Sequence, residues 1–72
     1  MDQAEITRMA NQIADYFSAY DHEEAVEGIA DHIAKFWDPR MRRTLFDMME
    51  SGGSALDPLV VEAASRLAPA SG

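Results

Sequence analysis

The stretch Phe36–Arg43, which reads FWDPRMRR, decides how this chain is divided. Proline suits the first position of a helix, and an aspartate directly before it can cap the free amide groups of the first turn. Asp38 and Pro39 are therefore a helix start signal in the middle of the chain. The sequence predicts a break at residues 37–39, with one helix before it and another after it.

The segment before this break predicts a helix that begins at Asp21. The carboxylate of Asp21 can accept the amide proton of Glu24 while Glu24 reaches back, as in a capping box. The apolar stripe of this helix consists of Val26, Ile29, Ala30, Ile33 and then Phe36 or Trp37. Gly28 interrupts the helix at a cost of about 1 kcal/mol relative to alanine. We interpret this glycine as a place where another helix passes close by.

Three further helices follow from similar signals. Apolar residues recur every three or four positions over residues 3–18, which indicates an amphipathic helix. After the break, a helix is predicted over 39–50, and it should stop at the glycine pair 52–53. Asp57–Pro58 repeats the start signal for a last helix over 58–67.

With 72 residues, the chain forms one domain at most. No strand pattern is present, so the fold class is all-α, a small bundle of three to four helices. We expect a single helical domain over residues 1–68 and a frayed C-terminal tail at 69–72. The centre of the core is predicted to contain Ile13, Phe17, Ile29 and Ile33.

Charge is distributed unevenly along the chain. Residues 1–34 carry a net charge of −7, residues 35–43 carry +3, and residues 44–72 carry −3. The positive segment also contains the only tryptophan. Because aromatic residues and arginine anchor protein interfaces, this segment is a candidate docking surface. The candidate partner-binding residues are Phe36, Trp37, Arg40, Arg42, Arg43 and Phe46.

Phe46 has an unusual position on its predicted helix. At about 100° per residue it lies about 140° from Met41, outside the apolar face to which Met41 belongs. It is either a core residue or a docking residue, and the sequence leaves both open. An alternative also exists for the whole run: Trp37 caps the core where two helices meet, and the arginines pair with acidic residues of their own domain.

The sequence lacks the motifs in which catalytic and cofactor-binding residues occur. Cysteine is absent, which excludes disulfides and thiolate metal sites. His22 and His32 lie ten residues apart in one predicted helix, so they cannot share a metal unless other segments contribute. No phosphate-binding loop or nucleophile elbow is present. We therefore expect that the chain is not an enzyme and has no catalytic, cofactor-binding or metal-ligating residue and no cofactor.

Composition also bears on partners and location. A net charge of −7 opposes binding to nucleic acid, which argues against a DNA-binding helix-turn-helix protein despite the short connections. No apolar run approaches the roughly 20 residues of a membrane span, and no signal peptide is visible. We expect a cytoplasmic protein that binds neither nucleic acid nor membrane.

Three blocks of the sequence resemble one protein family. They are RMANQIA at 8–14, AVEGIADHI at 25–33 running on into KFWDPRMRR at 35–43, and Gly52–Gly53 followed by LDPLV at 56–60. Together they resemble the delta subunit of bacterial soluble, molybdenum-dependent NAD⁺ formate dehydrogenases over roughly residues 6–67. The block KFWDPRMRR is the most specific of the three.

The resemblance implies a small accessory subunit of an oxidoreductase complex that oxidises formate. In that family a large alpha subunit carries bis-molybdopterin guanine dinucleotide and iron–sulfur clusters. Beta and gamma subunits carry FMN and further clusters and pass electrons to NAD⁺. The delta chain has no known cofactor and supports assembly or stability of the complex. The resemblance therefore implies that this chain docks on the large catalytic subunit.

Alternative roles stay open at this point. The chain could be a permanent structural subunit, or a transient maturation factor that binds the large subunit while cofactor is inserted. The subunit ratio in the active complex separates these two roles. A third interpretation is an unrelated helical adaptor that forms a homodimer, and each interpretation allows a homo-oligomer of the isolated chain.

Overall fold

The computed structural model describes residues 2–52 and 55–67. Within these ranges the chain is all-α, without a strand. Its four helices are α1 (Gln3–Phe17), α2 (His22–Phe36), α3 (Pro39–Glu50) and α4 (Pro58–Leu67). The predicted fold class and helix boundaries are confirmed, including the break at residues 37–39. The predicted frayed tail at 69–72 lies outside the described residues.

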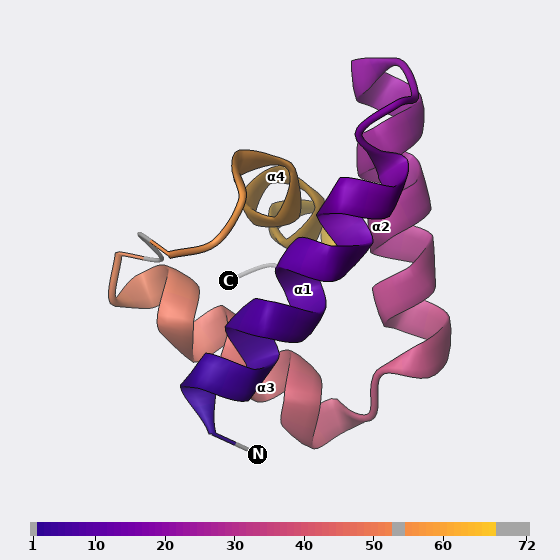
Figure 1. Ribbon diagram of the computed structural model, residues 1–72. Coiled ribbons are helices and arrows are strands. Elements are labelled where there is room, and N and C mark those ends of the chain that lie inside the picture. Colours follow the sequence, from indigo (N-terminus) through magenta and orange to yellow (C-terminus); the bar gives the residue numbers. More distant parts are fainter. Residues whose placement is uncertain (1, 53–54, 68–72) are drawn as a thin grey trace.

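α1 and α4 each pack against all three other helices, and the most extensive contact is between α2 and α4. Figure 1 shows α1 lying across the molecule, with α2 along one side, α3 below it and α4 behind. None of the helices in the described part of the chain is long and apolar enough to cross a membrane.

Both ends of α3 form as the sequence predicts. The Asp38 carboxylate accepts a hydrogen bond from the backbone amide of Met41 at 3.0 Å and caps the first turn. Gly52, just after the helix, has a φ of 115°, which a residue with a Cβ rarely adopts. Gly53 lies outside the described residues. Local signals therefore fix α3 in length and position.

The capping box predicted for α2 is wrong. Asp21 occupies the cap position, but its side chain makes no capping hydrogen bond. The same spacing of Asp and Glu does produce a cap at the start of α1, where the Asp2 carboxylate accepts a hydrogen bond from the Glu5 amide at 2.9 Å. At the start of α4, the Asp57 carboxylate accepts a hydrogen bond from the Leu59 amide at 2.9 Å.

The core was predicted correctly for α2 and incorrectly for α1. Ile29 and Ile33 are fully buried, whereas Ile13 and Phe17 are only partly buried. The fully buried residues of α1 are Ile6, Ala10 and Ala14. Two of these three are alanines, which let the backbone of α1 approach its neighbours closely. The larger apolar residues of α1 consequently lie at the edge of the core.

Gly28 permits a close contact between α1 and α2. A Cβ atom at this position would lie 2.8 Å from Cδ1 and 2.9 Å from Cζ of Phe17. These distances are well below the optimum of about 3.5–4.0 Å between carbon atoms. The prediction that another helix passes close to Gly28 is confirmed, and the residue that approaches it is Phe17.

We expect Gly28→Ala to lower the free energy of unfolding by about 1–3 kcal/mol, because it overpacks the contact with Phe17. In a Phe17→Ala background the ring is gone, and the better helix propensity of alanine should then stabilise the chain by up to about 1 kcal/mol. Urea unfolding of the unchanged chain, the two single variants and the double variant measures this change of sign. An equal effect of Gly28→Ala in both backgrounds would contradict the proposed contact.

Asn11 on α1 forms hydrogen bonds with the segment that precedes α4. Its Nδ2 donates to the carbonyl oxygen of Ala55 at 2.9 Å, and its Oδ1 accepts from the amide of Asp57 at 2.8 Å. Both ends of one amide side chain thus satisfy backbone groups of a distant segment. This clamp fixes where α4 begins relative to α1.

Candidate functional site

A first hollow lies where the start of α3 meets the end of α4. It has a volume of about 400 Å³, and its lining residues are Pro39, Arg42, Arg43, Phe46 and Leu67. Residues 42 and 46 are one helical turn apart, so their side chains are neighbours on the surface of α3. Leu67 comes from the last turn of α4. We call these five residues the basic pocket.

The arginines of α3 have no acidic partner among the residues that the structure describes. The arginines of this helix are Arg40, Arg42 and Arg43. None of them has an acidic oxygen within 4.0 Å in residues 2–52 and 55–67. The pairing within the domain that the alternative interpretation requires is therefore not found in these ranges. In this part of the chain, no carboxylate neutralises the arginines of the basic pocket.

Phe46 has features of both a core residue and a docking residue, the two roles that the sequence left open. It is half-buried and packs against the core, and it also lines the basic pocket. Its ring therefore forms an apolar wall beside two guanidinium groups. This combination of apolar area and fixed charge is typical of the residues that anchor an interface.

Trp37 lies in the core instead of projecting from it. It is 4% exposed and occupies the C-terminal cap of α2. The alternative interpretation, in which Trp37 caps the core where two helices meet, describes this position. The part of the indole that remains accessible lines a second hollow.

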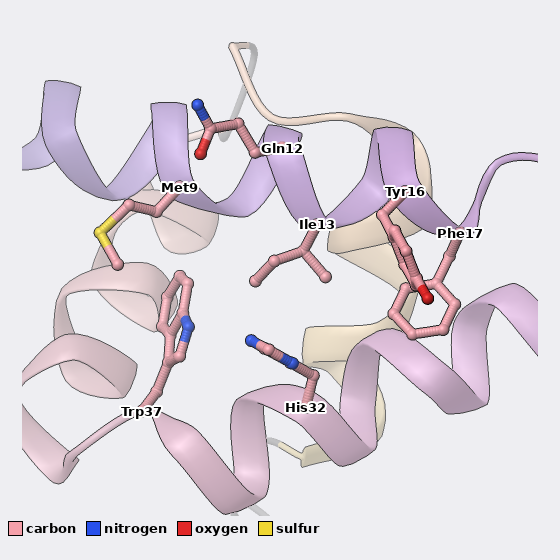
Figure 2. Close-up of a pocket in the computed structure, with 7 residues that line it drawn as sticks. All are labelled: Met9, Gln12, Ile13, Tyr16, Phe17, His32 and Trp37. Atoms are coloured by element: carbon pink, nitrogen blue, oxygen red, sulfur yellow. The ribbon is translucent and has the colours of Figure 1, made fainter.

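That second hollow is a groove of about 550 Å³ between α1 and α2. Its lining residues are Met9, Gln12, Ile13, Tyr16, Phe17, His32 and Trp37. Figure 2 shows Met9 and Trp37 at one end and the two α1 aromatics at the other. Ile13 and His32 point toward each other between these ends. We call this set of seven residues the aromatic groove.

The structure thus places five of the six predicted docking residues in or beside two surfaces that share no lining residue. Arg42, Arg43 and Phe46 belong to the basic pocket, and Trp37 belongs to the aromatic groove. Phe36 borders the groove, because its ring centre lies 4.8 Å from that of His32, one of the lining residues. Arg40 is exposed and lines neither hollow.

The aromatic groove was not predicted from the sequence, although a signal for it was present. The apolar arc of the first helix is wider than one core-facing stripe needs. Its fully buried part is formed by residues 6, 10 and 14. Its partly buried or exposed part contains Met9, Ile13, Tyr16 and Phe17. An apolar arc of this width indicates a second apolar surface beside the core-facing one.

One cluster of side chains has donor atoms close enough for a metal ion. Ligand atoms of His22, Glu23 and Glu62 lie within 4.8 Å of one another. The His22 ring nitrogen already lies 2.8 Å from Glu62, and Arg66 bonds to Glu23 at 2.9 Å and lies 3.5 Å from Glu62. The hydrogen bond to Glu23, followed by the nearby acidic charges, raises the pKa of Arg66. The cluster is a polar bridge between α2 and α4, and the expected lack of a metal site stays a prediction.

The sequence of this chain matches a known family over most of its length. The family model described as NADH-dependent formate dehydrogenase delta subunit FdsD matches residues 5–64. The matched range contains the three sequence blocks at 8–14, 25–43 and 52–60. Comparisons with curated proteins and with solved structures find no match. The resemblance seen in the sequence is confirmed, and the chain belongs to the family of formate dehydrogenase delta subunits.

Proposed function

We propose that this chain is a non-catalytic accessory subunit of an NAD-dependent formate dehydrogenase, which it helps to assemble or stabilise by docking on the large molybdenum-containing subunit. Family membership supports its place in the complex. The observation that carries the docking role is the basic pocket, where two arginines without a nearby acid in the described residues flank Phe46. The cofactors of formate oxidation are the molybdopterin guanine dinucleotide, iron–sulfur clusters, FMN and NAD of the other subunits.

The chemistry of the basic pocket indicates what it binds. An arginine side chain holds a carboxylate through two parallel hydrogen bonds, which fixes both position and orientation. Phe46 adds apolar area that water leaves on binding. Since the whole chain carries a net charge of −7, an acidic surface of the partner is attracted at this pocket and repelled elsewhere. The pocket therefore selects one docking orientation.

Docking of this kind stabilises a partner without any chemistry of its own. A subunit that binds only the folded large subunit shifts the folding equilibrium by mass action. At a concentration one hundred times the Kd, the shift is about 2.7 kcal/mol. An accessory role of this type requires neither a catalytic residue nor a cofactor in the delta chain.

Purification through an affinity tag on this chain tests the proposed function. We expect the large subunit to co-purify at a fixed ratio, together with formate-dependent reduction of NAD⁺ that the isolated chain lacks. If the chain is found on the cofactor-free large subunit but not in the active enzyme, it is a maturation factor instead. Recovery of the chain without any formate dehydrogenase subunit would overturn the proposal.

A further inference from the structure

The large hydrophobic side chains that are exposed in the described residues all lie around the aromatic groove. Tyr16 is 69% exposed, Tyr20 is 48% exposed and Phe36 is 72% exposed. Phe17 contacts both tyrosines edge-on, with ring centres 5.0 Å and 5.5 Å apart. Phe36 is tilted against His32, which lines the groove from the side of α2. The apolar surface therefore extends beyond the hollow on both helices.

The shape of this surface favours a helix over a small molecule. α1 and α2 each contain 15 residues and are about 22 Å long, so the groove lies between two extended walls. Small-molecule sites enclose roughly 70–90% of their ligand, whereas here Tyr20 and Phe36 lie outside the hollow and Tyr16 in its wall is 69% exposed. An amphipathic helix places one stripe of apolar side chains along such a groove. Met9 is flexible enough to adapt to the side chains that enter.

The charge on the walls of the groove indicates which charge its occupant carries. The two helices that form these walls carry six acidic and two basic residues, a net charge of −4. Asp15 and Glu24 are exposed and have no ion pair within 4.0 Å in the described part of the chain. Both basic residues have an acidic neighbour on their own helix: Lys35 lies 3.1 Å from Asp31, and Arg8 lies 4.0 Å from Glu5. A helix with lysine or arginine beside its apolar stripe therefore complements the groove.

The basic helix of a second copy of this chain does not fit this description. α3 carries three arginines, but its apolar face is already used in its own core. Leu45 is fully buried and Met48 is 8% exposed. α3 would have to leave its own domain to place these side chains in the groove of another copy. A second copy could supply this basic helix only by opening its own bundle, which favours a segment of a different chain.

We infer that the aromatic groove is a second docking site, which receives a basic amphipathic helix from another subunit of the formate dehydrogenase complex. This inference rests on the proposed function for the identity of the complex and on the groove for the chemistry of the segment. The chain then holds its partners at two surfaces of opposite charge. An acidic segment binds at the basic pocket, and a basic helix binds between α1 and α2.

Photo-crosslinking in the purified complex identifies the occupant. The photoreactive residue p-benzoylphenylalanine replaces Tyr16 in one variant, Phe36 in a second and Ser65 in a control. Ser65 is exposed on α4 and lines neither hollow. After irradiation, mass spectrometry should map the products from positions 16 and 36 to one helix with lysine or arginine beside an apolar stripe. The control should not react with that helix.

Truncation of the same two side chains measures their contribution. The double variant Tyr16→Ala, Phe36→Ala should bind its partner subunits about thirtyfold more weakly, the loss typical of a pair of aromatic anchors. The melting temperature of the free chain should hardly change, because both side chains are mostly exposed. The matched control Tyr16→Phe, Phe36→Tyr keeps both rings and should bind nearly as well as the unchanged chain.

The outcomes separate this inference from the proposed function. If the unchanged chain co-purifies with no formate dehydrogenase subunit, both fail. If the complex forms but positions 16 and 36 give no crosslink, or crosslink to an acidic segment or to a second copy of this chain, only the groove inference fails. The groove inference also fails, alone, if the double truncation binds as tightly as the chain that keeps both rings.

Discussion

An Ile29→Ala variant is expected to lose about 2–5 kcal/mol of the free energy of unfolding, the range measured for such truncations in protein cores. Ile29 is fully buried at the centre of the bundle. The variant loses the transfer free energy of the missing methyl and methylene groups and leaves a cavity that the helices fill only in part. A single core in a chain of this size supplies about 3–5 kcal/mol. The substitution therefore removes most of the stability of the domain.

Ile13→Ala is the matched control, because it removes the same atoms from a different place. Ile13 is only partly buried and lines the aromatic groove. Its side chain already borders open space, so we expect less than half the loss seen for Ile29→Ala. Urea unfolding followed by circular dichroism compares the two variants. Equal losses would contradict the position of the core between Ile29 and the alanines of α1.

The double variant Arg42→Ala, Arg43→Ala is expected to bind the large subunit about thirtyfold more weakly. Truncation of an arginine at the centre of an interface commonly costs about 2 kcal/mol or more, which corresponds to this loss in affinity. Within the free chain, exposed arginines contribute only about 0–1 kcal/mol, and neither residue has an ion pair within 4.0 Å in the described ranges. The helical content of the free chain should therefore stay nearly unchanged.

Two control variants make this experiment specific. Arg8→Ala removes a positive charge outside the basic pocket, where the arginine lies 4.0 Å from Glu5, and should leave binding nearly unchanged. Replacing Arg42 and Arg43 with lysine keeps the charge but loses the two parallel hydrogen bonds to a carboxylate, so it should weaken binding partially. Co-purification that survives the double alanine change, or unfolding of the free chain, would mean that these arginines only support their own helix.

The boundaries of the helices could be predicted because their signals act over a few residues. Asp38 and Pro39 start α3, and Gly52 follows its end, through contacts within one helical turn. The same holds for Asp57 and Pro58 at the start of α4. The one error of this kind was the capping box of α2, where Asp21 occupies the cap position but makes no side-chain hydrogen bond there. Family membership was also visible in the sequence, because the three blocks that carry the resemblance are continuous stretches of chain.

Only the tertiary structure decided which side of α1 faces the core. Hydrophobicity alone ranks Ile13 and Phe17 above the alanines, but the alanines allow closer packing and the structure buries them. That orientation of α1 leaves Met9, Ile13 and Phe17 to line the aromatic groove. Contacts such as that of Asn11 with Ala55 join residues 44 positions apart. The sequence by itself determined where helices begin and end, because those signals are local, whereas the two surfaces depend on how distant helices pack.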